Sequence, residues 1–229
     1  LVVRSMHRAF DAMRVPRAAV LVKCVNRIPH ARGLGSSSAA IVGGILAARA
    51  LVAEPRFSDA EVLALAAEME GHRDNVAACA LGGVVLSWVV GGVIRTAPLA
   101  VSPKLSVVLY VPQHEVKTEA ARAVLPDKVP HQHAAANAAT AALLIHALTQ
   151  DPALLWDATQ DWLHQPYRAN VMPNSFALLE KLRGAGTPAV LSGAGPSVLA
   201  FTSPGTTPAH VDGFAAHPLA IAEVGAQVS

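Results

Sequence analysis

The run Ala39–Val52 constrains the fold more than any other part of this sequence. It reads AAIVGGILAARALV, with Arg49 as its one charged residue. The run has the length of a helix but hardly any polar face, and a helix that is apolar on all sides must be buried. The chain has 229 residues, 52% of them hydrophobic, so it can enclose such a helix in a core.

A second stretch, Asn75–Ile94, carries no charged residue and has about the length of a membrane span. It contains the glycine pairs Gly82-Gly83 and Gly91-Gly92, and the residues between them, VVLSWVV, are mostly β-branched. That pattern favours a short helix, a turn and a buried strand over one continuous helix. The sequence therefore predicts no membrane partner.

The rest of the sequence alternates helical and strand patterns. Ser58, with Glu61 three residues later, predicts the N-cap of a helix that ends near Glu70. Further helices are expected over Val2–Met13, Thr118–Val124 and Ala134–Leu148, and another is expected to run from an N-cap at Asn174 to Gly184. Strands are expected over Ala18–Val25, over Leu105–Val111 and on both sides of Leu191–Ser197. The pair Ser102-Pro103 separates two mixed halves, so we expect an α+β fold with domains at residues 1–102 and 103–229.

The net charge and the two cysteines restrict which partners the protein can bind and in which compartment it is expected. The formal net charge is +2, and the scattered lysines and arginines form no basic stripe, which argues against nucleic acid as a partner. Cys24 and Cys79 lie far apart without a CxxC spacing, so we interpret both as core residues rather than as parts of a disulfide framework or zinc site. The N-terminus has no signal-peptide pattern, and the expected compartment is the cytoplasm.

A glycine-rich loop, PHARGLGSSSAA from Pro29 to Ala40, precedes the buried helix. Glycines let the backbone approach an anion, and a helix N-terminus offers N–H groups and partial positive charge. The loop lacks the lysine of a Walker A loop and the third glycine of the dinucleotide fingerprint. Its three serines and leading proline favour phosphate binding, and the alternative is a connection that only caps a buried helix.

Acidic residues gather where the helix after Ser58 is expected to end. Glu68, Glu70 and Asp74 lie close together around a turn at Gly71. One of these carboxylates and a loop serine would suit Mg²⁺, which takes few protein ligands. From spacing alone, an ordinary acidic helix end is the better interpretation. The turn LSGAGPS, Leu191–Ser197, is likewise only a tight turn when taken by itself.

Five stretches, in this order along the chain, resemble the GHMP kinase superfamily. The loop Pro29–Ala40 is similar to its central ATP-binding motif, and four more stretches resemble the homoserine kinase family within it. These are EMEGHRDNVAACALGG (Glu68–Gly83), VKTEAARAVLP (Val116–Pro126), QPYRANVMP (Gln165–Pro173) and LSGAGPSVLAF (Leu191–Phe201). The resemblance implies a ribosomal-S5-like N-domain and a ferredoxin-like C-domain. Homoserine kinases begin with a strand-rich segment carrying an Asn-Leu-Gly-x-Gly-type motif that this chain lacks, so the N-domain is expected to be incomplete.

The resemblance also implies roles for individual residues. ATP would be bound by Pro29, His30, Ala31, Arg32, Gly33, Leu34, Gly35, Ser36, Ser37, Ser38 and Ala39. Ser37 and Glu68 would hold Mg²⁺, with Glu68 preferred to Glu70 because it takes the first position of a Glu-Leu-Glu-like pattern. The substrate L-homoserine would be bound by His72, Asp74, Asn75, Thr118, Arg122 and Arg168. The expected catalytic residues are Glu68, Asn75, Arg122 and Arg168. Two arginines suit a carboxylate because a planar guanidinium grips it through paired hydrogen bonds; without the resemblance, each would be read as a surface ion pair.

The implied reaction transfers the γ-phosphoryl group of ATP to the side-chain hydroxyl of L-homoserine, on the route to threonine. Phosphoryl transfer depends on positioning and charge stabilisation, so no general base is assigned. Three alternatives stay open: another GHMP kinase that acts on an isoprenoid alcohol, an inactive nucleotide-binding fragment, and a structural domain whose glycines only make turns. A homodimer is also left open.

Overall fold

The computed structural model describes residues 1–54 and 56–228, and the chain divides into two compact units. Unit 1 comprises Leu1–Pro29, Gly35–Ala100 and a C-terminal stretch that begins at Ala222, and unit 2 comprises His30–Leu34 and Val101–Ile221. The change of unit after Ala100 lies close to the boundary expected after Ser102. Two segments, His30–Leu34 and the stretch from Ala222, lie in the unit opposite to the one expected for them.

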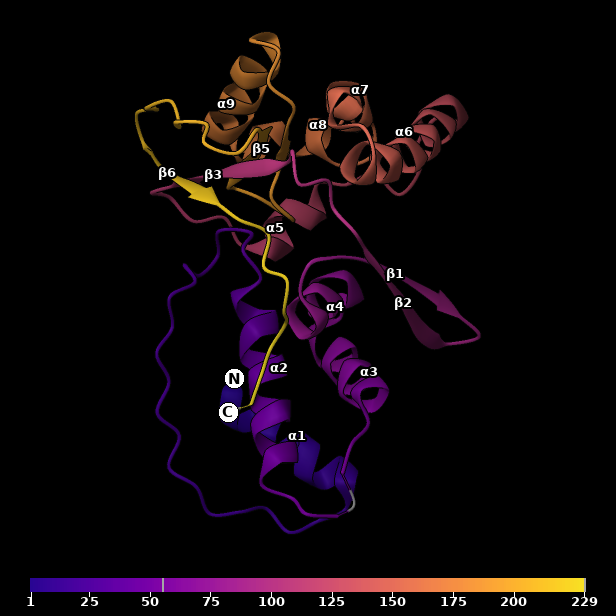
Figure 1. Cartoon of the computed structure of the whole chain (residues 1–229), viewed down its shortest axis with the longest axis vertical. Coiled ribbons are helices and arrows are strands. Elements are labelled where there is room, and N and C mark those ends of the chain that lie inside the picture. Colours follow the sequence, from indigo (N-terminus) through magenta and orange to yellow (C-terminus); the bar gives the residue numbers. More distant parts are fainter. Residues whose placement is uncertain (55, 229) are drawn as a thin grey trace. The chain divides into compact units, whose positions relative to one another are not determined.

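Unit 1 packs helices around α2 and adds a two-stranded antiparallel sheet (Figure 1). Its elements are α1 (Val2–Met13), α2 (Ser36–Ala50), α3 (Asp59–Glu70), α4 (Arg73–Leu81), β1 (Val84–Val90) and β2 (Val93–Leu99). Helix α2 packs against α1, α3 and α4, and its Ile41, Val42 and Ile45 are buried almost completely. The apolar run is thus buried as predicted, although the helix begins earlier, at Ser36.

The local predictions for unit 1 are largely confirmed. Helix α1 has the predicted bounds. Ser58 caps α3 in a capping box: its Oγ accepts a hydrogen bond from the Glu61 N–H, and the Glu61 carboxylate accepts one from the Ser58 N–H at 2.8 Å. The stretch Asn75–Ile94 forms the rest of α4, a glycine turn, β1 and the start of β2. The expectation that its strand is buried is wrong, because no residue of β1 is buried and Trp88, Val89 and Val90 are exposed. No helix in the described part of the chain is long and apolar enough to cross a bilayer.

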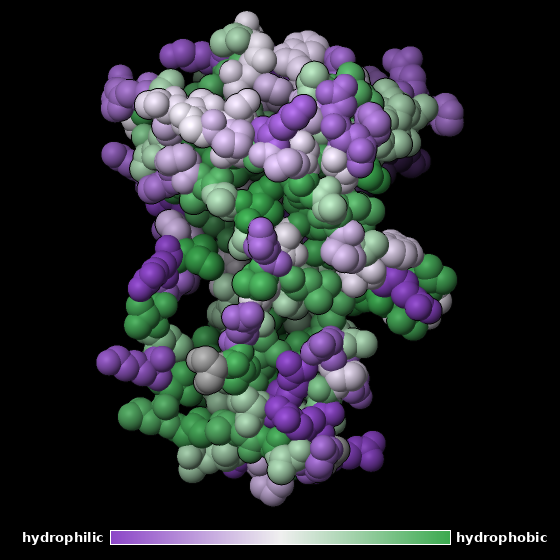
Figure 2. All heavy atoms as spheres, in the orientation of Figure 1, coloured by the Kyte–Doolittle hydropathy of each residue, from purple (hydrophilic) through white to green (hydrophobic). Residues whose placement is uncertain are grey.

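The strand predicted over Ala18–Val25 is wrong. The segment pairs with no strand among the described residues, and Leu21 is 100% exposed. Cys24 is exposed as well, so its interpretation as a core residue is also wrong, whereas Cys79 is partly buried. Figure 2 shows hydrophobic side chains along this segment on the surface. Strand propensity alone does not make a strand, because a strand needs a hydrogen-bonding neighbour.

The C-terminal stretch belongs to unit 1 because it lies along the end of α4. The Gly83 N–H donates to the Ala222 carbonyl at 2.6 Å, and the Ala226 N–H donates to the Cys79 carbonyl at 3.0 Å. Gly82 has a φ of +76°, and a Cβ there would lie 2.3 Å from the carbonyl carbon of Val224. Because Gly82 has no side chain, the backbone of Val224 and Gly225 can lie directly against it.

Unit 2 is built on a four-stranded antiparallel sheet with strand order β4-β5-β3-β6 (Figure 1). The strands are β3 (Ser106–Pro112), β4 (Ala189–Leu191), β5 (Val198–Thr202) and β6 (Phe214–Leu219). The helical elements are α5 (Thr118–Ala123), α6 (His131–Thr149), η1 (Pro152–Leu154), α7 (Leu155–Ala158), α8 (Gln165–Arg168), η2 (Ala169–Val171) and α9 (Pro173–Gly184). Helix α9 packs on β4 and β5, and Val108, Leu179 and Val198 lie in the shared core. Mixed helices and antiparallel strands in both units confirm the α+β class.

Within unit 2 the main elements follow the sequence patterns. The predicted strands on both sides of Leu191–Ser197 are β4 and β5, and they pair with each other. Asn174 is not the N-cap of α9, because the helix begins at Pro173 and Met172 takes the cap position. Proline suits the first helical position because its fixed φ matches the helix and because a backbone N–H at that position has no acceptor within the helix. Strand β6 and the short helices α7 and α8 were not predicted.

Candidate functional site

The glycine-rich loop passes from unit 2 to unit 1 between Leu34 and Gly35. In unit 2, Arg32 anchors its first half: Nε donates to the Pro112 carbonyl at 2.9 Å, and Nη2 donates to the Gln113 carbonyl at 2.7 Å. The Arg32 side chain is only 13% exposed. Its guanidinium is therefore occupied by protein carbonyls and by the Glu115 carboxylate, which lies 3.3 Å from Nη1, and these contacts anchor the loop.

The turn Ser192–Ser197 packs against the same half of the loop. Ser192 Oγ donates to the Gly33 carbonyl at 2.9 Å, and the Ser197 N–H donates to the Arg32 carbonyl at 3.4 Å. Gly33 has a φ of +71°, and a Cβ there would lie 2.2 Å from the Ser192 carbonyl oxygen. Glycine is thus required at position 33 by both the backbone conformation and the approach of the turn. The turn does more than reverse the chain, because it holds the loop.

In unit 1 the second half of the loop opens α2. Gly35 takes the N-cap position with a φ of +70°, and no side chain caps the helix. The first turn carries no acidic residue. Ser37 is exposed, and Ser38 Oγ is buried with no hydrogen-bond partner among the described residues. An uncapped helix N-terminus with small residues has the backbone N–H groups and the partial positive charge that bind an anion.

Two of the acidic side chains at the end of α3 have different partners. Ser37 Oγ donates to Glu70 Oε2 at 2.8 Å. Glu68 instead pairs with Arg8 of α1 at 2.5 Å, and both side chains are largely exposed. The structure therefore brings Ser37 together with Glu70 and not with Glu68. A hydroxyl and a carboxylate are the oxygen donors that Mg²⁺ prefers, so this pair fits the ion.

The start of α4 places two predicted substrate residues on one cavity. His72 is the N-cap residue, and its Nδ1 lies 3.2 Å from the Glu70 carbonyl oxygen. His72 and Asp74 line a cavity of about 280 Å³ together with Gly71, Arg73 and Ser87. Asn75, which is partly buried, does not line this cavity. Ser87 comes from β1, and no sequence spacing connects it to the α4 residues.

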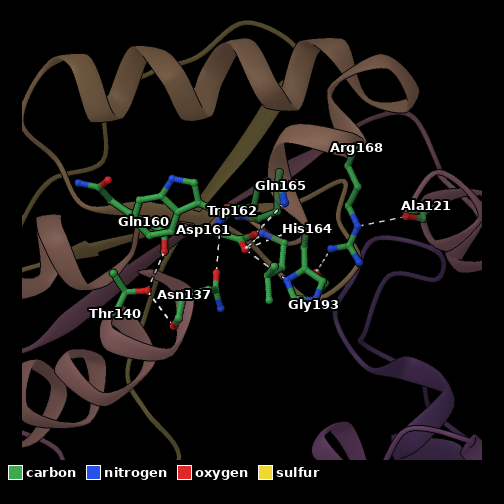
Figure 3. A network of polar contacts seen from close by, with 12 residues as sticks. Ala121, Asn137, Thr140, Gln160, Asp161, Trp162, His164, Gln165, Arg168 and Gly193 are labelled. Carbon is green, nitrogen blue, oxygen red and sulfur yellow. Dashed lines mark hydrogen bonds and ion pairs between the residues drawn. The ribbon is translucent and has the colours of Figure 1, made fainter. Parts of the chain in front are cut away.

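The remaining predicted substrate residues lie in unit 2. Thr118 begins α5 and is exposed, whereas Arg122 in its last turn is partly buried. Arg168, at the end of α8, is only 7% exposed; its Nε donates to the Ala121 carbonyl and its Nη1 to the Gly193 carbonyl, both at 3.1 Å (Figure 3). Its third nitrogen, Nη2, has no hydrogen-bond acceptor among the described residues. One edge of the guanidinium is thus left for an anion.

Burial and neighbouring charges act on Arg168. Burial lowers the pKa of Arg168, the carboxylate of Asp161 opposes that change, and the positive charge of Arg122 adds to it. The two arginines therefore lie close enough to repel each other. A negative group bound near both of them would relieve that repulsion.

A larger cavity of about 380 Å³ in unit 2 contains none of the predicted site residues. Its wall includes Trp156, Trp162, Phe176 and Arg183. Arg183 lies over the Trp156 ring at 5.1 Å and donates to the Trp156 carbonyl at 2.8 Å. The Arg183 guanidinium therefore already has partners within the protein, the Trp156 ring and carbonyl. We assign this cavity no part in the reaction.

Known proteins resemble both halves of the chain. Residues 1–83 match the family model described as GHMP kinases N terminal domain, and residues 137–212 match GHMP kinases C terminal. The chain is 54% identical over 208 residues to a homoserine kinase of Streptomyces coelicolor, covering 90% of this chain and 67% of that protein. It is 49% identical over 234 residues to a homoserine kinase of Streptomyces avermitilis, covering 100% of this chain and 77% of that protein.

A solved structure shows the same fold. The crystal structure of homoserine kinase from Cytophaga hutchinsonii matches with a TM-score of 0.83 at 24% identity, covering 96% of this chain and 76% of that one. The two domain models match in the order of the two halves, and about half of the residues are shared with the streptomycete proteins. The chain therefore belongs to the GHMP kinases and, within them, to the homoserine kinase family.

Proposed function

We propose that this protein transfers the γ-phosphoryl group of ATP to the side-chain hydroxyl of L-homoserine, which yields O-phosphohomoserine and ADP for threonine biosynthesis. The observation that carries the proposal is the 54% identity over 90% of the chain to a protein named homoserine kinase. The uncapped start of α2 and the arginines of unit 2 supply groups that suit a phosphate and a carboxylate.

The loop binds the ATP phosphates through its backbone. In this proposal the N–H groups at the start of α2, from Ser36 onward, and the adjacent glycines face the phosphate oxygens. Arg32 and Ser192 keep the first half of the loop in place through bonds to carbonyl groups. The protein contributes mainly fixed positive potential, which needs no rearrangement during the reaction.

A carboxylate at the end of α3 and the hydroxyl of Ser37 hold Mg²⁺. Glu70 is the carboxylate that the geometry favours, because it already lies against Ser37 Oγ. Glu68 is the carboxylate that the family resemblance favours, and it pairs with Arg8 in this structure. When bound, Mg²⁺ neutralises charge on the phosphate oxygens.

The amino-acid substrate is recognised by its charged groups. Arg122 and the remaining Nη2 edge of Arg168 bind the carboxylate of homoserine, and Thr118 contributes from the start of α5. The family resemblance also assigns His72, Asp74 and Asn75 to substrate binding, and His72 and Asp74 line one cavity. No side chain is assigned as a general base, since phosphoryl transfer depends on orientation and charge stabilisation.

The test is homoserine-dependent ADP release by this chain with MgATP, with L-threonine and mevalonate as comparison substrates. Release with homoserine alone supports the proposal. Release with mevalonate instead would assign the chain to the kinases of isoprenoid alcohols. An ATP-induced rise in melting temperature with no turnover on any substrate would indicate a nucleotide-binding module that does not catalyse the reaction.

We also propose a cytoplasmic location, and the choice between a monomer and a homodimer stays open. Both cysteines are free in the structure, which suits a reducing compartment. Light scattering coupled to size-exclusion chromatography measures the molar mass and decides between monomer and dimer.

A further inference from the structure

The carboxylate of Asp161 organises the start of helix α8. Its Oδ1 accepts hydrogen bonds from the Leu163 N–H at 2.9 Å and the His164 N–H at 3.2 Å, and its Oδ2 accepts one from the Gln165 N–H at 2.7 Å (Figure 3). The Asp161 side chain is 17% exposed. One partly buried side chain therefore satisfies three backbone donors at the point where α8 begins.

Helix α8 depends on such contacts because it is very short. It spans Gln165–Arg168, and a helix of this length has no stability of its own in water. At its start it is held by Asp161, and the side chain of Gln165 accepts a hydrogen bond from the Leu191 N–H of β4 at 2.7 Å. At its end it carries the buried guanidinium of Arg168.

Arg168 connects two segments that the proposed function uses. Its bond to the Ala121 carbonyl ties it to the residue next to Arg122, and its bond to the Gly193 carbonyl ties it to the turn that holds Gly33 through Ser192. All of these residues lie in unit 2. A displacement of α8 would therefore change where Arg168 and its free Nη2 edge stand relative to α5.

We infer that Asp161 is a positioning residue for this reaction: by accepting hydrogen bonds from the backbone N–H groups at the start of α8, it holds Arg168 where its guanidinium meets the substrate carboxylate. The inference rests on the proposed function, because it takes Arg168 to be a carboxylate-binding residue. Asp161 does not touch the substrate in this scheme, and it acts only through the placement of Arg168.

The charge of Asp161 and its hydrogen bonds are expected to change KM for homoserine in opposite directions, so the direction of the change tests the inference. Removing a negative charge that acts on Arg168 makes the surroundings of its guanidinium more positive, which by itself strengthens the binding of a carboxylate and lowers KM for homoserine. Removing the acceptor of these backbone hydrogen bonds loosens α8 and weakens the binding of the carboxylate, so it raises KM for homoserine. A raised KM for homoserine in a variant that lacks the Asp161 charge therefore indicates that Arg168 is no longer held in position.

The experiment compares Asp161→Ala, Asp161→Asn and Arg168→Lys in steady-state kinetics. Asp157→Asn is the matched control, because Asp157 is exposed on neighbouring α7 and its side chain forms no hydrogen bond or ion pair with the described residues. We expect Asp161→Ala to raise KM for homoserine about 10-fold, as the loss of charge-assisted hydrogen bonds does, and to leave KM for MgATP within about 2-fold. Asp161→Asn should raise it less, because its amide oxygen still accepts hydrogen bonds.

Coupling between the two residues supplies a second readout. If Asp161 acts through Arg168, the double variant Asp161→Asn/Arg168→Lys should show a KM for homoserine no higher than that of Arg168→Lys alone. An unchanged or lowered KM in both Asp161 variants, with a raised KM in Arg168→Lys, would overturn the inference and leave the proposed function standing. An equal rise in KM for both substrates would also overturn it, because that pattern indicates general loosening. Should Asp161→Ala fail to fold, Asp161→Asn and the double variant decide the question.

If Arg168→Lys leaves KM for homoserine unchanged, the carboxylate role of Arg168 fails, and the inference fails with it. Turnover of homoserine by the unaltered chain is measured in the same series. Its absence would count against the proposed function itself, independently of Asp161.

Discussion

Ser37 Oγ donates a 2.8 Å hydrogen bond to Glu70 Oε2, which joins the start of α2 to the end of α3. The neighbouring carboxylate of Glu68 lies against Arg8 of α1 instead. Two residues apart in the sequence, these carboxylates have different surroundings in the fold. The contact makes Glu70 the residue at which magnesium dependence is best tested.

Glu70→Gln removes a proposed carboxylate ligand of Mg²⁺, so it should raise the Mg²⁺ concentration for half-maximal activity about 10-fold and lower kcat on the order of 100-fold. Glu68→Gln breaks an exposed ion pair of the kind worth about 0.2–1 kcal/mol, so it should change the Mg²⁺ requirement less than about 2-fold. Titration of Mg²⁺ at saturating ATP measures both. Binding of Mn²⁺, followed by electron paramagnetic resonance, provides a readout without turnover. A larger effect from Glu68→Gln would make Glu68 the ligand.

Gly33→Ala should strongly impair ATP binding. The new Cβ would lie 2.2 Å from the Ser192 carbonyl oxygen, at a backbone φ of +71° that side chains rarely adopt. Ser192→Ala removes only one neutral hydrogen bond, worth about 0.5–1.5 kcal/mol, and should raise the Kd for ATP about 2- to 10-fold. Equilibrium binding of a fluorescent ATP analogue measures both. Normal affinity in Gly33→Ala would show that the turn does not hold the loop.

Two adjacent glycines in α2 should respond to alanine in opposite ways. A Cβ at Gly44 would lie 2.5 Å from the Val2 carbonyl oxygen of α1, whereas a Cβ at Gly43 meets nothing within 4 Å. Gly44→Ala should lower the free energy of unfolding by about 1–3 kcal/mol through overpacking. Gly43→Ala should raise it by up to about 1 kcal/mol, because alanine favours helix. Urea unfolding of the two variants compares them directly, and equal effects would contradict the close packing of α1 on α2.

The capping box of α3 should make stability depend on pH in the acidic range. Hydrogen bonds from the Ser58 hydroxyl and backbone hold the pKa of Glu61 below its usual range. A lowered carboxyl pKa adds stability that is fully present above the ordinary pKa and is lost as pH falls through the lowered value. The melting temperature of the wild type should therefore approach that of Glu61→Gln as the pH is brought below the usual glutamate range. A constant difference between the two proteins would show that the charged form is not favoured.

The two thiols should differ in reactivity. Cys24 is exposed, whereas Cys79 is partly buried, and burial raises the pKa of the Cys79 thiol with a further contribution from the charge of Glu70. Since the thiolate is the reactive form, a maleimide should label Cys24 rapidly and Cys79 slowly. Cys24→Ser should remove the fast phase, as followed by mass spectrometry. Loss of the slow phase instead would place the exposed thiol at Cys79.

Local interactions explain which parts of the fold could be predicted. The capping box at Ser58, the bounds of α1 and the glycine turn after α4 depend on residues close together in the sequence. The strand predicted over Ala18–Val25 failed because a strand also needs a neighbour, which propensity does not supply. The cap assigned to Asn174 failed by a small shift, because Pro173 already suits the first helical position.

The sequence by itself determined the α+β class, the buried helix after the glycine-rich loop and the motifs that indicate the kinase family. Only the tertiary structure decided which groups meet. Ser192 reaches Gly33 across 159 positions of the chain, Arg168 reaches Ala121 across 47, and Ser37 meets Glu70 rather than Glu68. Helices and caps form from hydrogen bonds between near neighbours, so their patterns repeat at short spacing. Contacts between distant segments depend on how whole elements pack, and no short spacing encodes them.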